Sequence, residues 1–133
     1  GEGICVIDLD TLMPGSALYD FGDMVRSATL NMAEDSKDYK NVVCRADIFE
    51  ALARGFLDGG DFLTPCEKAN MTFGGLLMTL ECGVRFLTDY LDGDHYFKTH
   101  RPGHNLDRCR TQFALVQSII DQHDKLQGFV DSL

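Results

Sequence analysis

Apolar residues recur at steps of three and four along most of this chain, a spacing that places them on one face of an α-helix. The pattern covers residues 17–33, a segment from residue 47 that two glycines stop at 59–60, about 75–92, and 105–129. The third segment carries the stripe Leu76, Leu77, Leu80, Val84, Leu87 and Leu91. In the last segment the residues expected to face inward are Leu106, Cys109, Phe113, Val116, Ile119, Ile120 and Leu126. We therefore expect a mainly α-helical protein.

Three of the expected helices begin at residues that favour helix N-termini. Ser16 follows a Pro-Gly turn, and its hydroxyl can accept a hydrogen bond from the first helical turn. Asp47 with Glu50, and Thr64 with Glu67, have the spacing of a capping box, in which each side chain bonds the backbone N–H of the other residue. A proline directly after the threonine suits a first helical position.

The first residues show a different pattern. A short apolar run over residues 4–7 ends on Asp8, which predicts a strand over residues 4–8. Residues 41–44 are also β-branched and short, and are either an edge strand or an extended connector.

Three glycines interrupt the third helical pattern. Gly74, Gly75 and Gly83 are poor helix formers, each costing about 1 kcal/mol relative to alanine. They indicate either close contacts between helices or a break near Gly74.

Composition narrows the class of protein. The 133 residues are 44% hydrophobic and 25% charged, which suits a single domain with one core, residues 1–133. A net charge of −9 argues against a nucleic-acid or anionic membrane partner, and no apolar run approaches the roughly 20 residues that span a bilayer. Five cysteines without a Cys-x-x-Cys pair predict reduced thiols and a cytoplasmic protein.

Two carboxylates follow the predicted strand. Asp8 stands where a buried strand meets open space, and Asp10 points to the same side of an extended chain. Carboxylate oxygens at such an exit suit a hard cation such as Mg²⁺. Asp8 could instead cap a turn, and Asp10 could contact a sugar hydroxyl or remain a solvated turn residue.

Asp8-Leu9-Asp10, the following Tyr19-Asp20-Phe21-Gly22 and the stretch over residues 77–94 resemble the aminoglycoside-phosphotransferase-like small-molecule kinases, most closely the N-acetylhexosamine 1-kinases. The resemblance covers residues 5–126. It implies the helical C-terminal lobe of a protein-kinase-like fold with a short N-terminal β element. It also implies that Asp8, with Asp10, binds Mg²⁺ on the phosphates of ATP, and that Asp20 braces the catalytic loop without touching substrate.

The same resemblance places Arg85 and Tyr96 in the sugar pocket. The planar guanidinium of Arg85 would bind sugar hydroxyls or an acetamido oxygen, and Tyr96 would cover one face of the sugar. The alternative for Arg85 is an ion pair with Glu81, four residues earlier on the same helix. Relatives often carry an aromatic residue after the arginine that matches Arg26, where this chain has Ser27, so the particular sugar is left open.

The implied activity is transfer of phosphate from ATP to the anomeric hydroxyl of an N-acetylhexosamine. The ATP-holding lobe and the catalytic loop with its Asp have no counterpart in this chain, so we expect a C-terminal piece of the kinase domain, with the catalytic base upstream and no activity alone. The alternative is a non-catalytic module that binds a sugar or a partner. Oligomerisation is left open.

Remaining candidates have simpler interpretations. His100 and His104 are four residues apart, but proline and glycine between them oppose the helix that a metal pair would need, so a surface loop is expected. Arg26 is expected to pair with a nearby carboxylate, and Arg108 and Arg110 to serve helix packing and ion pairing.

Overall fold

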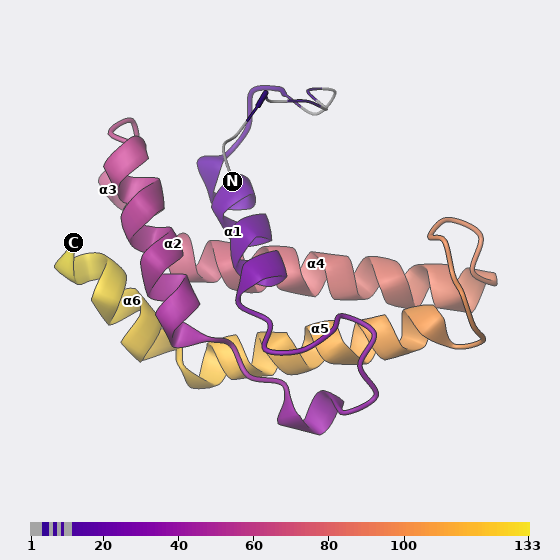
Figure 1. Ribbon diagram of the computed structural model, residues 1–133. Coiled ribbons are helices and arrows are strands. Elements are labelled where there is room, and N and C mark those ends of the chain that lie inside the picture. Colours follow the sequence, from indigo (N-terminus) through magenta and orange to yellow (C-terminus); the bar gives the residue numbers. More distant parts are fainter. Residues whose placement is uncertain (1–3, 6, 8, 10–11) are drawn as a thin grey trace.

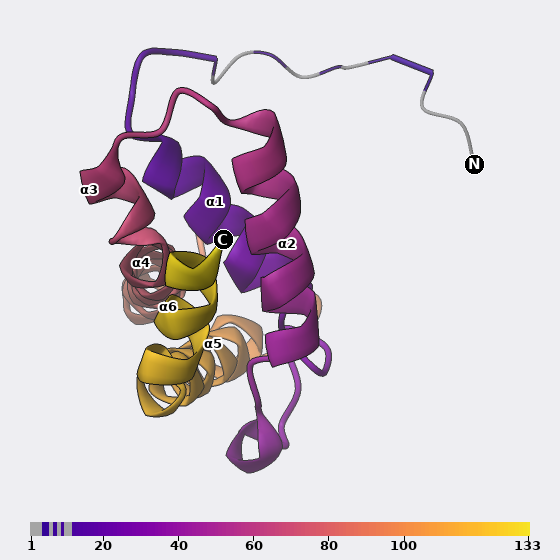
Figure 2. The ribbon, with the colours of Figure 1, turned by 90° about the vertical axis from the view of Figure 1, so that its left-hand side faces the viewer.

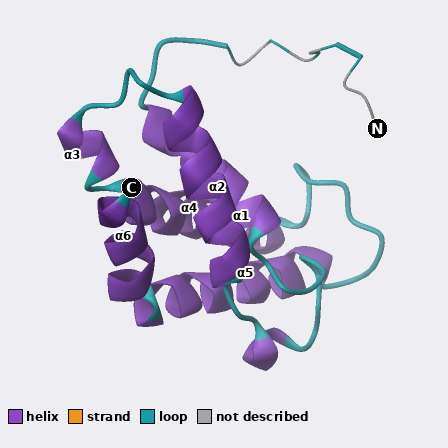
Figure 3. Ribbon diagram, turned by 60° about the vertical axis from the view of Figure 1, so that its left-hand side comes forward, coloured by secondary structure: helices purple, strands orange, loops and turns teal. Residues whose placement is uncertain are grey.

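The computed structural model describes residues 4, 5, 7, 9 and 12–133 and is mainly helical in that part (Figure 1). The elements are α1 (Ala17–Ala28), the 3₁₀ helix η1 (Tyr39–Asn41), α2 (Ala46–Gly59), α3 (Pro65–Lys68), α4 (Met71–Asp92), α5 (His104–Asp121) and α6 (His123–Ser132). Helices and loops make up the described residues, with no strand among them (Figure 3). The expectation of a mainly α-helical protein is confirmed.

The two longest helices, α4 and α5, lie side by side and run in opposite directions (Figure 1). α1 crosses α4, α2 packs beside α1, and α6 turns back from the end of α5 to meet α2 and α4 (Figure 2). The loop between α4 and α5 lies at the end of this pair that is far from α6 (Figure 1).

The core forms where these helices meet. Phe21 of α1 lies edge-on to Phe49 of α2, with 5.7 Å between the ring centroids. This offset geometry is favoured by the ring quadrupoles and adds to the free energy gained by burying both rings. The other buried apolar residues around them are Val25, Val42, Cys44, Ala53, Met71, Leu115, Ile119, Leu126 and Val130.

Two of the three predicted caps are confirmed. The Ser16 hydroxyl accepts from the N–H of Leu18 at 3.3 Å, and Thr64 and Glu67 form a complete capping box. The box at Asp47 is wrong, because the N-cap of α2 is Arg45, two residues earlier, and the helix begins at Ala46. The N–H of Arg45 donates to the carbonyl of Thr29, so a tertiary hydrogen bond determines where the helix begins.

Tertiary contacts also shorten the first predicted helix. α1 ends at Ala28 and not at residue 33, because Leu30 forms an isolated antiparallel bridge with Cys44. Residues 41–44 are therefore a connector with one bridging residue. The last predicted helix is divided at Gln122, whose side-chain amide donates to the carbonyl of Cys44 at 3.0 Å.

The predicted N-terminal strand is wrong for the residues of it that the structure describes. Ile4, Cys5 and Ile7 form no strand, and both isoleucines are exposed. A strand is stable only when a neighbouring strand pairs with its N–H and C=O groups, and the described residues offer none. The remaining residues of that segment lie outside the described part.

The glycines of α4 are explained by close helix contacts, and α4 continues through Gly74 without a break. A Cβ built on Gly75 would lie 2.9 Å from Cγ1 of Val25, and one on Gly74 would lie 2.8 Å from the carbonyl oxygen of Leu18. On the other helix, a Cβ on Gly22 would meet the carbonyl of Gly74. α1 and α4 therefore cross backbone against backbone.

Close packing also determines which face of α4 is buried. The buried positions are mostly small or polar, namely Met71, Thr72, Gly74, Gly75, Thr79, Gly83, Phe86 and Asp89. Of the predicted apolar stripe, Leu80, Val84 and Leu91 are exposed. Phe113 and Ile120 of α5, expected inside, are also exposed, while Leu115 is fully buried.

Candidate functional site

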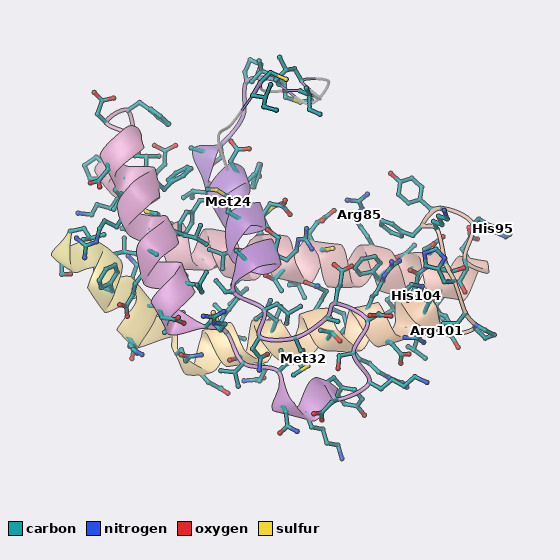
Figure 4. The ribbon with its side chains drawn as sticks, in the orientation of Figure 1. Met24, Met32, Arg85, His95, Arg101 and His104 are labelled. Atoms are coloured by element: carbon teal, nitrogen blue, oxygen red, sulfur yellow. The ribbon has the colours of Figure 1, made fainter. Side chains whose placement is uncertain are left out.

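Arg85 and Tyr96, eleven residues apart in the sequence, meet at the end of α4 that leads into the loop to α5. The guanidinium of Arg85 lies over the rings of Tyr96 and Phe97, 5.6 and 5.3 Å from their centroids, and its Nη2 donates to the Tyr96 hydroxyl at 3.4 Å. Figure 4 places Arg85 along α4 and His95 in the loop beyond its end. The structure thus brings together the two residues that the sequence assigned to one pocket.

A cavity of about 290 Å³ lies beside this pair. Its walls combine aromatic rings with a guanidinium, hydroxyls and carboxylates; the lining residues are Arg85, Thr88, Asp89, Asp92, Tyr96 and Phe97. An apolar surface with a few convergent polar groups is the usual composition of a small-molecule site. The cavity can take a polar ring, with one face against an aromatic side chain and its edge groups hydrogen-bonded.

Asp89 holds the loop that forms one wall of this cavity. Its carboxylate accepts from the backbone N–H groups of Tyr96 at 2.7 Å and Phe97 at 2.9 Å, although the residue is only 5% exposed. Burial acts to raise the pKa of this carboxyl, but the N–H donors, that of Phe97 foremost, outweigh it and hold the pKa below its usual value. Asp89 is therefore an anionic anchor for both aromatic residues.

Asp89 also holds the turn that follows α4. Gly93 and Asp94 adopt left-handed backbone conformations, with φ of 101° and 61°, and the N–H of Asp94 donates to the Asp89 carbonyl at 2.7 Å. Asn105 at the start of α5 donates to both Asp89 and Asp94 at 2.8 Å. Sequence reasoning missed Asp89 and Asn105, because the apolar stripe of α4 does not mark the buried face on which Asp89 lies.

The ion pair between Arg85 and Glu81 is present but long. Nε of Arg85 lies 3.6 Å from Oε1 of Glu81, and both side chains are about half exposed. An exposed pair of this kind stabilises a helix by only about 0.3–0.5 kcal/mol. Arg85 can therefore turn its donors to a ligand at little cost.

The predicted metal ligands Asp8 and Asp10 lie outside the described residues, so their role stays a prediction. Among the residues that the structure describes, no group of three or more His, Cys, Asp or Glu side chains converges on one point. Asp20, predicted to brace a catalytic loop, lies exposed in the first turn of α1.

The prediction for the two histidines is wrong in one respect: His104 is buried. Its Nδ1 accepts from the N–H of His100 at 3.2 Å, and its Nε2 lies 3.3 Å from a carboxylate oxygen of Asp35. Figure 4 shows His104 at the start of α5 and Arg101 in the loop just before it. With both ring nitrogens engaged by protein groups, His104 joins two loops instead of pairing with His100 around a metal.

The arginines of the predicted helices form ion pairs as expected. Arg26 pairs with Asp23 at 2.8 Å and with Glu34 at 3.1 Å. Nε of Arg108 lies 3.6 Å from Oε2 of Glu34, and Nη1 of Arg110 lies 3.6 Å from Oδ1 of Asp107. Glu34, which the sequence did not single out, is shared by two arginines from different helices.

All five cysteines are free thiols. Burial raises the pKa of the Cys44, Cys82 and Cys109 thiols, so these remain protonated near neutral pH. Within the described residues, no helix combines the length and apolar character that crossing a membrane requires.

A search of the chain against models of known protein families finds no match.

Proposed function

We propose that this chain is the helical, acceptor-binding lobe of an ATP- and Mg²⁺-dependent sugar kinase that phosphorylates the anomeric hydroxyl of an N-acetylhexosamine. The observation that carries the proposal is the cavity in which Arg85 and Tyr96 meet. The sequence resemblance also implies that both residues belong to the acceptor pocket.

The cavity offers the groups that an N-acetylhexosamine needs. Arg85 can donate two parallel hydrogen bonds to hydroxyl or acetamido oxygens, and Thr88 and Asp92 can accept from hydroxyls. The rings of Tyr96 and Phe97 lie at 82° to each other with centroids 4.8 Å apart, so they form a corner of apolar wall. A sugar ring has an apolar face of C–H groups that packs on such a wall.

Asp8 and Asp10 would hold the metal. Mg²⁺ prefers oxygen ligands and binds through one or two carboxylates together with substrate phosphates, so a pair of aspartates fits it. When bound, Mg²⁺ neutralises charge on the transferred phosphoryl group. In this proposal the group that accepts the proton of the sugar hydroxyl comes from a part of the kinase domain that this chain lacks.

A second candidate is a sugar-binding module without catalysis. It is favoured by the fact that all lining residues of the cavity lie within residues 85–97 of this chain.

The decisive experiment has two steps. Ligand-observed NMR with the purified chain should detect saturable binding of N-acetylglucosamine or N-acetylgalactosamine, weakened by Arg85→Ala. A longer protein that contains this chain and a phosphate-binding lobe is then assayed for sugar-dependent ADP release. Binding with release supports the kinase, and binding without release supports the module. No binding contradicts both.

A further inference from the structure

The outer side of α4 carries a regular apolar stripe. Its members follow one another at steps of four, three, four, three and four residues; they are Phe73, Leu77, Leu80, Val84, Leu87 and Leu91. Because each residue of a helix turns by about 100°, this stripe lies opposite Gly75, which packs against Val25 of α1. Four members of the stripe are exposed and the other two are only partly buried. The steps are the a and d spacing of a coiled coil, in which such a stripe faces another helix.

Two exposed aromatic side chains from neighbouring helices widen this stripe. On one side, Tyr19 of α1 lines an apolar groove of about 370 Å³ with three residues of α4, namely Leu77, Met78 and Glu81. On the other side, Phe113 of α5 lies against Gly83, where a Cβ would come within 2.7 Å of its ring. The stripe and these two rings together form an apolar face built from three helices.

The area of this apolar face is sufficient for a dimer. Its most accessible members are between 37% and 74% exposed; they are Tyr19, Phe73, Leu80, Val84, Leu91 and Phe113. A large apolar side chain has about 150–250 Å² of surface, so these six leave roughly 500 Å² uncovered. Two copies joined through this face would bury roughly 1,000 Å² of apolar area. Since homodimer interfaces are about 65% apolar, this area corresponds to about 1,500 Å² in total, a standard size for a specific complex.

The stripe is also symmetric along the helix, because its steps read the same in both directions from residue 82. Two antiparallel copies of α4 therefore place Leu80 of one opposite Val84 of the other. In the same register Leu77 lies opposite Leu87, and Phe73 lies opposite Leu91. A two-fold interface of this kind buries the same residues on both copies and closes at two subunits. The antiparallel orientation also brings helix ends of opposite dipole sign together.

Charge does not oppose contact between two copies at this face, although the net charge of the chain is −9. The charged residues between positions 73 and 91 are Glu81, Arg85 and Asp89. Asp89 is buried and accepts hydrogen bonds within its own chain, and Glu81 and Arg85 form an ion pair at 3.6 Å. The outer side of α4 is therefore close to neutral in a chain that is acidic as a whole, which suits an identical apolar partner.

We propose that this chain forms a two-fold dimer in which the apolar stripes of two antiparallel α4 helices pack against each other. The dimer follows from the spacing, the area and the neutrality of the face. It depends on neither the sugar site nor the metal site of the proposed function.

Sedimentation equilibrium of the purified chain tests the dimer. Interfaces of this size have dissociation constants in the micromolar range or below, so the chain at about 100 µM should have the mass of two copies. Val84→Glu and Val84→Lys place a charge of either sign at the centre of the stripe. Each should raise the dissociation constant at least about a hundredfold, because the dimer would bury two like charges close together.

Two controls separate loss of the dimer from loss of the fold. Glutamate and lysine are better helix formers than valine, so circular dichroism should show unchanged helix content in both Val84 variants. Phe62→Glu changes an exposed apolar residue in the loop between α2 and α3, away from α4, and should leave the dissociation constant unchanged. A chain that stays monomeric at the concentration tested would overturn the proposal. Equal weakening by Val84→Glu and Phe62→Glu would also overturn it.

The orientation has its own readout. In a dimer of isotope-labelled and unlabelled chains, the ring of Phe73 should show intermolecular nuclear Overhauser effects to the methyl groups of Leu91. Contacts between Leu91 of one copy and Leu91 of the other would show parallel helices and contradict the proposed arrangement. In a longer protein that contains the phosphate-binding lobe, a monomer whose Tm falls with Val84→Glu would show that the lobe covers the stripe. That result would overturn the dimer and leave the proposed kinase standing.

Discussion

The side-chain amide of Asn105 donates to the carboxylate of Asp89 at 2.8 Å, and this bond joins α5 to α4 beneath the loop that carries Tyr96 and Phe97. The same carboxylate accepts from the backbone N–H groups of both aromatic residues. One buried anion therefore connects the packing of the two longest helices to the shape of the candidate sugar cavity.

Asp89→Asn should make the thermal stability of the protein less dependent on pH. The folded pKa of Asp89 lies below its unfolded value of about 3.9, so its stabilising contribution is complete above that value and is lost as the pH falls through the folded pKa. The variant should have a clearly lower Tm than the wild type at neutral pH. The gap should narrow below about pH 4, where the wild type also loses its charge.

Thermal unfolding followed by circular dichroism between pH 7 and pH 3 measures this gap. Asp58→Asn, which changes an exposed carboxylate in the last turn of α2, is the control and should leave the Tm nearly unchanged. A gap that stays constant across the pH range would show that Asp89 contributes through shape and not through charge.

Gly22→Ala should destabilise the fold by about 1–3 kcal/mol, the usual cost of overpacking. The added methyl would meet the Gly74 carbonyl and lie 2.6 Å from the Met78 side chain, so α1 and α4 would have to separate. Gly55→Ala is the matched variant, since its methyl meets nothing within 4 Å on α2. It should stabilise by about 0.5–1 kcal/mol through helix propensity. Urea unfolding measures the free energy of unfolding of both variants. If both substitutions change it in the same direction, the close crossing of α1 and α4 is refuted.

Arg85→Ala should weaken sugar binding by at least about tenfold, because a pocket that loses a charged hydrogen-bond donor loses at least that much. Its Tm should change little, since the ion pair with Glu81 is exposed. Arg110→Ala is the control: Arg110 is equally exposed, pairs with Asp107 and lies over the Tyr39 ring, away from the cavity. The readout is the dissociation constant for N-acetylhexosamine. A large fall in Tm with unchanged binding would make Arg85 a structural residue.

The chain by itself should not transfer phosphate from ATP, because positioning by the phosphate-binding lobe supplies most of phosphoryl-transfer catalysis. In a protein that contains both lobes, Asp8→Asn should nearly abolish turnover while leaving the Tm unchanged, since the amide keeps the shape of the side chain but loses the charge that holds Mg²⁺. Coupled ADP-release assays measure turnover by the isolated chain and by the Asp8→Asn variant of the two-lobed protein. Sugar-dependent turnover by the pure isolated chain would contradict this prediction.

Local signals in the sequence were sufficient for the helical class, the Ser16 and Thr64 caps and the ends of α2 and α4 at glycine, whereas they left Gly74 open between a close contact and a break. Each depends on neighbours within a few residues or on the absence of a side chain, both of which are visible in the order of residues. Arg85 and Tyr96, which the resemblance implied to share a pocket, do line one cavity; whether that cavity binds a sugar stays a prediction.

Tertiary structure decided the rest. Burial of α4 through its glycines, and not through Leu80 and Val84, follows from how closely α1 and α5 approach it, which periodicity cannot show. The start of α2 at Ala46 depends on a hydrogen bond from Arg45 to Thr29, sixteen residues earlier. The cavity between Arg26, Phe86 and Arg108 takes its lining from α1, α4, α5 and two loops, so it exists only once the helices have packed.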